Sequence, residues 1–210
     1  MTDVIPARTL SLRDVKQRFD LHKVSESDFF PEWQIAAADL PAQERWLLDR
    51  AQREFLYLAE EPLHEEMVKL VVLSPLLSVA GFYQRPFRPV AEHHVELTLD
   101  AGEEKIRGRL DMLVLSDSLW VVAVESKNSH LSVRVALPQM LCYMLASPPA
   151  QADRFGLATN GDEFLLLKLV KSEPPQYALS RPFSLLNPGN ELYTVATILQ
   201  RLGQGVAIAA

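Results

Sequence analysis

The first third of the chain has the apolar spacing of helices joined by loops. Apolar residues recur every three or four positions over residues 41–59, which is the spacing of one face of a helix. A second and more apolar helix is expected over residues 63–80, where Pro75 predicts a kink or a division into two helices. We therefore interpret residues 1–60 as an N-terminal helical extension, followed by one domain over residues 61–210.

Beyond residue 90 the apolar period changes to that of β-strands. Three strands, a helix, two strands and a last helix are expected in turn, over residues 93–100, 106–115, 119–127, 133–146, 155–160, 163–170 and 191–202. The second and third strands are apolar on both faces, so they should be central strands covered on each side. This order predicts the fold class α/β, with a central mixed β-sheet flanked by helices.

Charged side chains interrupt the two central strands. If residues 116–118 form the hairpin loop, Asp111 faces Ala123, and Asp111, Glu125 and Lys127 share one face of the sheet because side chains alternate along a strand. Two carboxylates so close together repel each other, and Mg²⁺, which prefers oxygen ligands, would remove that repulsion. Lys127 would then stand beside an attacking water or stabilise charge on a phosphate. A Glu-x-Lys sequence alone is weak support, since a solvated strand end often carries it.

The wider order of motifs resembles a known family. The segments GRLDMLVL and VVAVESKN are similar to the D…(D/E)xK core of the PD-(D/E)xK, or restriction-endonuclease-like, superfamily, with Leu110 in place of the usual proline. Gln139 and Tyr143 fit the QxxxY motif of RecB-like nucleases. The segments SPLLSVAGF and LATNGDEFLLLKL resemble the N-terminal nuclease domain of type I restriction enzyme motor (R) subunits.

This resemblance implies a restriction-endonuclease-like core and a metal-dependent nuclease that hydrolyses DNA phosphodiester bonds with Mg²⁺, for which Mn²⁺ can substitute. Asp111 and Glu125 would bind the metal, and Glu65 would support the metal or its water. Lys127 would position or activate the nucleophile. Cutting both strands of DNA would favour a homodimer.

Two of the implied roles leave alternatives open. Glu65 and Glu66 are adjacent, and a helix turns by about 100° per residue, so they point in different directions. The family spacing to the segment PLL favours Glu65 as the site residue. Gln139 and Tyr143 are four positions apart on one helix face, where the resemblance implies contact with substrate and ordinary packing is the alternative.

Other polar residues are given no catalytic role. His93 and His94 point to opposite faces of a strand, which disfavours a metal site made by the pair. Lys105, Arg107 and Arg109 form a short basic run that would either contact phosphates or solvate a strand face.

Composition narrows the function classes. The net charge of −6 and the pI of about 5.4 disfavour a protein that coats nucleic acid, although a local basic groove can coexist with an acidic whole. We expect any DNA binding to be weak and dependent on a divalent cation. Cys142 is the single cysteine, so neither an intrachain disulfide nor a zinc cluster is expected. No segment approaches the roughly 18–20 apolar residues of a membrane span, and the start lacks a signal-peptide pattern, so we expect a cytoplasmic protein without membrane contact.

Two other functions are alternatives to the DNA nuclease. A non-catalytic module that keeps the nuclease fold and binds nucleic acid or a protein partner would suit the acidic charge. The D…ExK pattern favours the enzyme. Hydrolysis of RNA or of a small phosphoester is the remaining alternative.

Overall fold

The computed structural model describes residues 3–25, 27–35, 39–99, 104–116, 119–147 and 153–209. Within them the strands are β1 Asp3–Pro6, β2 His22–Lys23, β3 Phe87–Leu99, β4 Glu104–Ser116, β5 Leu119–Ser126, β6 Asp153–Thr159, β7 Glu163–Val170, β8 Gln176–Leu179 and β9 Phe183–Ser184. They form one nine-stranded mixed sheet in the order β1, β4, β5, β6, β7, β8, β2, with β3 paired to β4 and β9 paired to β7. The predicted α/β class with a central mixed sheet is confirmed.

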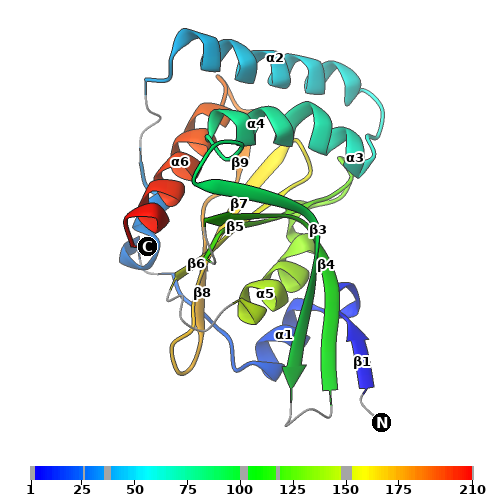
Figure 1. Ribbon diagram of the computed structural model, residues 1–210. Helices are drawn as coiled ribbons and strands as arrows, with labels where there is room; N and C mark the ends of the chain where they lie inside the picture. The colour runs from blue at the N-terminus through cyan, green and yellow to red at the C-terminus, as the bar shows by residue number, and fades with distance from the viewer. Residues whose placement is uncertain are drawn as a thin grey trace.

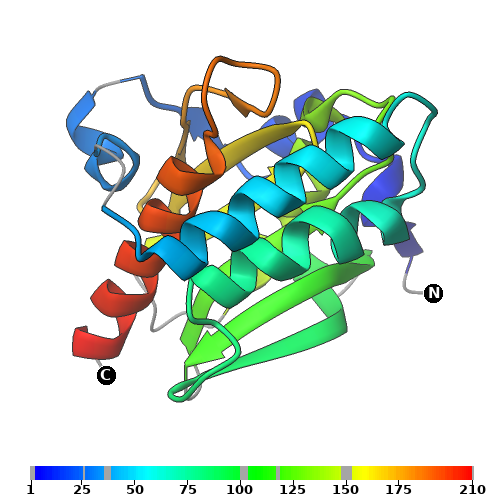
Figure 2. The ribbon, with the colours of Figure 1, turned by 90° about the horizontal axis from the view of Figure 1, so that it is seen from above.

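Helices cover both faces of this sheet (Figures 1 and 2). The α-helices of the described residues are α1 Leu12–Arg18, α2 Ala42–Leu58, α3 Glu65–Val68, α4 Ser74–Val79, α5 Leu137–Ala146 and α6 Leu192–Ala209. Helices α2, α3, α4 and α6 pack on one face, and α1 and α5 pack on the other. Among the described residues, no helix combines the length and the apolar character needed to cross a bilayer.

The central strands separate two hydrophobic cores. Leu113 of β4 is buried in the core under α5, whereas its neighbour Val114 is buried in the core under α2 and α6. The same alternation occurs in β7, where Leu166 belongs to one core and Leu165 and Leu167 belong to the other. Side chains alternate along a strand, so a strand covered on both faces needs apolar residues at nearly every position. Both strands are therefore central, which the sequence predicts for β4.

The turn between β6 and β7 is built by the Asn-Gly-Asp sequence. Gly161 has a φ of +90°, a conformation that residues with a Cβ rarely adopt. The side-chain oxygen of Asn160 accepts hydrogen bonds from the N–H groups of Asp162 and Glu163, at 3.2 and 2.7 Å. Asn160 and Gly161 therefore have turn roles, as expected for a strand-turn-strand unit.

The expected kink at Pro75 takes the form of a π-helical segment. One continuous helix runs through α3, the π segment η4 Lys69–Leu73, and α4. Proline has no N–H to donate, and the wider π turn immediately before Pro75 accommodates that missing hydrogen bond without ending the helix. The helix therefore stays in one piece, with its first turn at Glu65.

The N-terminal 60 residues are more than a helical extension. Helix α2 occurs where the apolar spacing predicts it and α1 precedes it, but β1 pairs in parallel with β4 and β2 pairs in parallel with β8. Both strands thus belong to the same sheet as the rest of the chain. The sequence missed them because strands of four and two residues are too short to show an alternating pattern.

The register of the β4–β5 hairpin differs by two positions from the predicted one. The observed pairs include Met112 with Val124 and Leu113 with Ala123, and a bulge lies between Val114 and Leu115. Asp111 therefore does not face Ala123, as expected from the sequence. Because a slip of two positions keeps every side chain on its original face, the conclusion that Asp111 and Glu125 share a face still holds.

Candidate functional site

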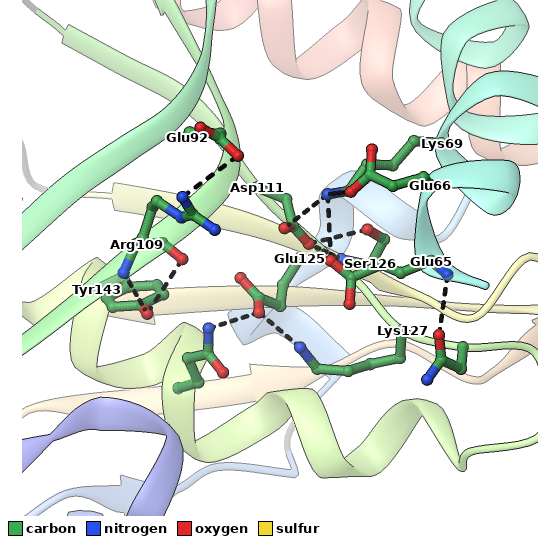
Figure 3. Close-up of polar contacts among 12 residues, drawn as sticks. Glu65, Glu66, Lys69, Glu92, Arg109, Asp111, Glu125, Ser126, Lys127 and Tyr143 are labelled. Atoms are coloured by element: carbon green, nitrogen blue, oxygen red, sulfur yellow. Dashed lines mark hydrogen bonds and ion pairs between the residues drawn. The ribbon is translucent and has the colours of Figure 1, made fainter.

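The candidate site lies where β4 lacks a partner strand. β3 pairs with β4 along one edge, with an interruption at Asp111, so β1 and β5 both pair with the opposite edge. β1 pairs with residues 104–107 and β5 with residues 112–116, so within the described ranges no strand pairs with residues 108–111 on that edge. Asp111, at the end of this gap, precedes the Met112–Val124 pair of the hairpin and lies next to Glu125 on β5 (Figure 3).

Tyr143 of α5 fills part of this gap. Its hydroxyl accepts a hydrogen bond from the N–H of Arg109 at 2.9 Å and donates one to the carbonyl oxygen of Arg109 at 3.3 Å. The ring approaches the strand closely, since a Cβ at Gly108 would collide with the Tyr143 hydroxyl. Glycine at this position therefore lets a helix side chain take the place of the missing strand.

The space that remains is an open cavity of about 600 Å³. Its walls include every residue that the sequence singled out for the site, namely Glu65, Asp111, Glu125, Lys127, Gln139 and Tyr143. These residues come from a helix start, two strands, the end of a strand and a second helix. The fold brings them together around one opening, and their chemical roles remain predictions.

Asp111 is held by donors on both of its oxygens. Its Oδ2 accepts the N–H and the hydroxyl of Ser126, at 2.6 and 2.8 Å, and its Oδ1 lies 3.0 Å from the ammonium of Lys69. Burial alone would raise the pKa of this carboxyl, but the Ser126 hydrogen bonds and the Lys69 cation hold its pKa below the usual range. Asp111 is therefore a fixed carboxylate anion.

Glu125 has one bonded and one free oxygen. Its Oε1 accepts the Lys127 ammonium at 2.6 Å and the Gln139 amide at 2.5 Å. The residue is only 2% exposed, and its Oε2 is buried without a hydrogen-bond partner within the described residues. Burial and the neighbouring Asp111 raise the pKa of Glu125 to about 7, in spite of the Lys127 cation. A buried, unpartnered carboxylate oxygen is costly unless something supplies the missing positive charge.

The two adjacent glutamates of α3 point in different directions, as their spacing requires. The Glu65 side chain lies within the cavity, and burial together with nearby Asp111 raises its pKa. The Glu66 side chain is 77% exposed. Asn128 fixes the start of the helix by accepting the Glu65 N–H at 2.9 Å. Glu65 therefore points into the cavity and Glu66 into solvent, which favours Glu65 over Glu66 as a site residue.

Lys69 is a site residue that the sequence analysis missed. Its ammonium lies 3.1 Å from Glu65 Oε1, 2.9 Å from Glu66 Oε1 and 3.0 Å from Asp111 Oδ1 (Figure 3). Its spacing from the two glutamates is the usual one for helical ion pairs and was available in the sequence. Its ion pair with Asp111, on a strand 42 positions later (111 − 69 = 42), does not follow from that helical spacing.

Basic side chains line the same cavity as these carboxylates. Arg107, Arg109 and His94 of the β3–β4 pair line the cavity together with Arg8, which follows β1. Arg107 is bonded to Glu96 at 2.6 Å and Arg109 to Glu92 at 3.3 Å, so part of this positive charge is already neutralised. His93 and His94 are adjacent on β3, where they pair with Leu110 and Arg109, and of the two only His94 lines the cavity.

The donor set is compatible with a divalent cation but is not a finished metal site. No group of three His, Cys, Asp or Glu side chains in the described ranges is arranged to hold a metal ion. The Lys69 ammonium lies between Glu65 and Asp111 instead. The free Oε2 of Glu125 and the oxygens of Asp111 and Glu65 are nonetheless the ligand type that Mg²⁺ and Mn²⁺ prefer. The residues therefore fit a hard cation, provided that the Lys69 ammonium moves away from Glu65 and Asp111.

Comparisons with known proteins give a distant structural similarity and no matching family. No family model matches it, and no match was found among curated proteins. Among solved structures, it is similar to a fragment assigned as an HsdR subunit of a type I restriction enzyme from Vibrio vulnificus YJ016, at 19% sequence identity and a TM-score of 0.40. The match covers 65% of this chain and 26% of that one, so the chain spans about a quarter of that structure.

Proposed function

We propose that this protein is a metal-dependent nuclease that hydrolyses phosphodiester bonds of DNA. The observation that carries the proposal is the buried carboxylate of Glu125, which lies beside the carboxylate of Asp111 in an open cavity and has one oxygen without a hydrogen-bond partner among the described residues. Two carboxylates and a lysine that are held together inside a cavity cost stability and suggest an arrangement kept for chemistry.

Asp111 and Glu125 would hold the ion, with Glu65 as a further oxygen donor. A bound Mg²⁺ or Mn²⁺ would lower the pKa of a water molecule and neutralise charge on the phosphate. Ser126 keeps Asp111 in its ionised, oriented form through two hydrogen bonds. Lys127, at 2.6 Å from Glu125, carries the positive charge that would position the water or stabilise the negative charge that develops during attack.

Gln139 and Tyr143 have different parts in this arrangement. Gln139 binds the same Glu125 oxygen as Lys127, so it turns the other oxygen toward the site of the cation. The Tyr143 hydroxyl is engaged with the backbone of Arg109, and burial raises its pKa, so it would not serve as a base. Any contact of Tyr143 with substrate would come from the part of the ring that borders the cavity.

The basic side chains that line the cavity suggest how a nucleic acid would lie. Arg8, Arg107 and Arg109 line the same cavity as the carboxylates, and their guanidinium groups can bind phosphate oxygens. Because Arg107 and Arg109 already have acidic partners, they would add few net phosphate contacts. We therefore expect weak, cation-dependent DNA binding with a modest salt dependence, about 0.9 in slope per neutralised phosphate on duplex DNA.

Cleavage assays would test the proposal. Wild type and Lys127→Ala would be incubated with duplex DNA, single-stranded DNA and RNA, in Mg²⁺, in Mn²⁺ and in EDTA. We expect DNA cleavage by wild type with either metal, none in EDTA, and none by Lys127→Ala. Lys105→Ala is the matched control, since Lys105 is also ion-paired but lies outside the cavity. Equal cleavage by Lys127→Ala and wild type would show that this site is not responsible.

A non-catalytic module that binds nucleic acid or a protein partner is the second candidate. The position of Lys69 favours it, because an ammonium already neutralises Glu65 and Asp111 and could do so permanently. The net charge of −6 agrees with a role that needs little nucleic-acid affinity. Wild type without cleavage of any of the three substrates, together with partner or DNA binding in EDTA, would select this candidate.

A further inference from the structure

The ammonium of Lys69 stands where a cation bound by Glu65 and Asp111 would stand. It is 3.1 Å from Glu65 Oε1 and 3.0 Å from Asp111 Oδ1, and its side chain is only 20% exposed. Both oxygens of Asp111 are thereby engaged, because Ser126 binds the other one. A divalent ion can gain Asp111 Oδ1 as a ligand only if this ammonium moves away.

On the same helix, Glu66 provides a contact that the Lys69 ammonium can keep when it leaves Glu65 and Asp111. Glu66 Oε1 lies 2.9 Å from Lys69 Nζ, and the Glu66 side chain is 77% exposed. Figure 3 shows Lys69 between the inner pair, Glu65 and Asp111, and the outer Glu66. A lysine side chain has four rotatable carbon–carbon bonds, so a small rotation would keep the contact with Glu66 and release the other two.

The free oxygen of Glu125 gives an incoming ion a ligand before Lys69 moves. Oε2 of Glu125 is buried and has no hydrogen-bond partner in the part of the chain that the structure describes, and the side chain is 2% exposed. Its other oxygen is fixed by Lys127 and Gln139, so the free one cannot turn to find a donor elsewhere. The site therefore already holds one cationic group, the Lys69 ammonium, and still offers an oxygen ligand, Oε2 of Glu125, to a second cation.

We propose that Lys69 is an internal counterion of the carboxylate site, which a divalent cation displaces toward Glu66, and that this competition sets the metal affinity. The proposal rests on the metal site of the proposed function. Glu65, Asp111 and Glu125 carry three negative charges when ionised, and Lys69 and Lys127 carry two positive ones, a net of −1 (2 − 3 = −1). A divalent ion added without movement of Lys69 would crowd three cationic groups together, which like-charge repulsion in a half-buried site disfavours.

Mn²⁺ binding, measured by electron paramagnetic resonance and by calorimetry near pH 8, would test the proposal without any activity assay. Lys69→Met keeps the length of the side chain and removes its charge. We expect it to bind Mn²⁺ at least about tenfold more tightly than wild type, a gain of about 1.4 kcal/mol. Lys69→Arg keeps the competing cation and should bind no more tightly than wild type.

Lys105→Met is the matched control, since Lys105 is also partly buried and paired with one glutamate at 2.6 Å, but lies outside the cavity. It should leave the Mn²⁺ affinity within about twofold of wild type. Wild type that binds Mn²⁺ while Lys69→Met binds with equal or lower affinity would overturn the displacement of Lys69 alone. Absence of Mn²⁺ binding in wild type and in every variant would overturn the metal site of the proposed function and this inference with it.

A measurement on the wild type covers the case in which Lys69→Met does not fold. The ¹⁵N signal of the Lys69 ammonium would be followed by NMR during a Mg²⁺ titration and assigned with Lys69→Arg. We expect the signal to shift and its hydrogen exchange to accelerate as the ammonium leaves Asp111. A signal unchanged at saturating Mg²⁺ would show that Lys69 stays in place, against the proposal.

Discussion

The hydroxyl of Tyr143 bonds to both the N–H and the carbonyl oxygen of Arg109, a residue 34 positions earlier in the chain. A helix side chain thus satisfies a strand edge that no neighbouring strand reaches. The cavity exists because β1 and β5 leave this stretch of β4 unpaired on one edge, and Tyr143 supplies hydrogen bonds to two part-buried backbone groups there.

The first prediction follows from this contact. Tyr143→Phe removes the hydroxyl and keeps the ring, so the Arg109 backbone loses its partner. We expect a loss of about 1–3 kcal/mol in the free energy of unfolding, the usual cost of leaving a buried polar group unsatisfied. Urea denaturation would measure it. A change below about 0.5 kcal/mol would mean that water replaces the hydroxyl without cost and that Tyr143 does not hold the gap.

The second prediction concerns the glycine opposite the Tyr143 ring. A Cβ at Gly108 would overlap the Tyr143 hydroxyl and ring carbons, so Gly108→Ala should destabilise the protein by about 1–3 kcal/mol, as overpacking does. Gly205→Ala is the matched control, because a Cβ at Gly205 of α6 meets no atom within 4 Å. That change should be neutral or stabilise by up to about 1 kcal/mol. Thermal melts of both variants would show the contrast, and equal melting temperatures would contradict it.

Hydrophobic periodicity was sufficient to predict the core elements of the fold. The strands β4, β5, β6 and β7 and the helices α2, α5 and α6 follow patterns long enough to identify. The short strands β8 and β9 were missed for the same reason as β1 and β2, namely that two to four residues carry no period. Their places in the sheet are set by pairing with distant strands, which a local pattern does not contain.

The candidate site was predictable where local geometry determines it. Asp111 and Glu125 share a face whether the hairpin register is the expected one or the observed one, because the two differ by an even number of positions. Lys69, Ser126 and Arg8 were missed because their roles depend on contacts between distant parts of the chain. The Gly108–Tyr143 contact was missed because neither residue alone indicates an unpaired strand edge.

The third prediction is a pH dependence of stability in EDTA. Burial and Asp111 raise the pKa of Glu125 from 4.5 to about 7, so the folded state keeps a proton that the unfolded state loses. Stability from this group is therefore fully present below pH 4.5 and is lost as pH rises toward 7, by up to roughly 3 kcal/mol.

Glu125→Gln removes this titration and should flatten the stability curve between pH 5 and about 7.5, leaving the variant more stable than wild type at the upper end. Urea denaturation at several pH values, in EDTA, would compare the two proteins. A wild-type curve that rises through this interval would show that Glu125 is ionised in the folded protein at pH 5, with a pKa that is not raised.

The last prediction separates the two carboxylates by the sign of their effect on stability. Repulsion between Asp111 and Glu125 alone would make Asp111→Asn stabilising. The structure gives the opposite expectation, because Asp111 accepts two hydrogen bonds from Ser126 and an ion pair from Lys69. An asparagine amide can keep the bonds to Ser126 through its oxygen, but its NH₂ group would then face the Lys69 ammonium, donor against donor. In EDTA at pH 8, Asp111→Asn should therefore lose about 1–3 kcal/mol, whereas Glu125→Gln should gain stability. Both should abolish Mg²⁺-dependent cleavage, since each removes a charged oxygen ligand. Denaturation and cleavage assays on the same preparations would show two variants with equal loss of activity and opposite changes in stability. If both variants were stabilised and both remained active, neither carboxylate would be needed for catalysis.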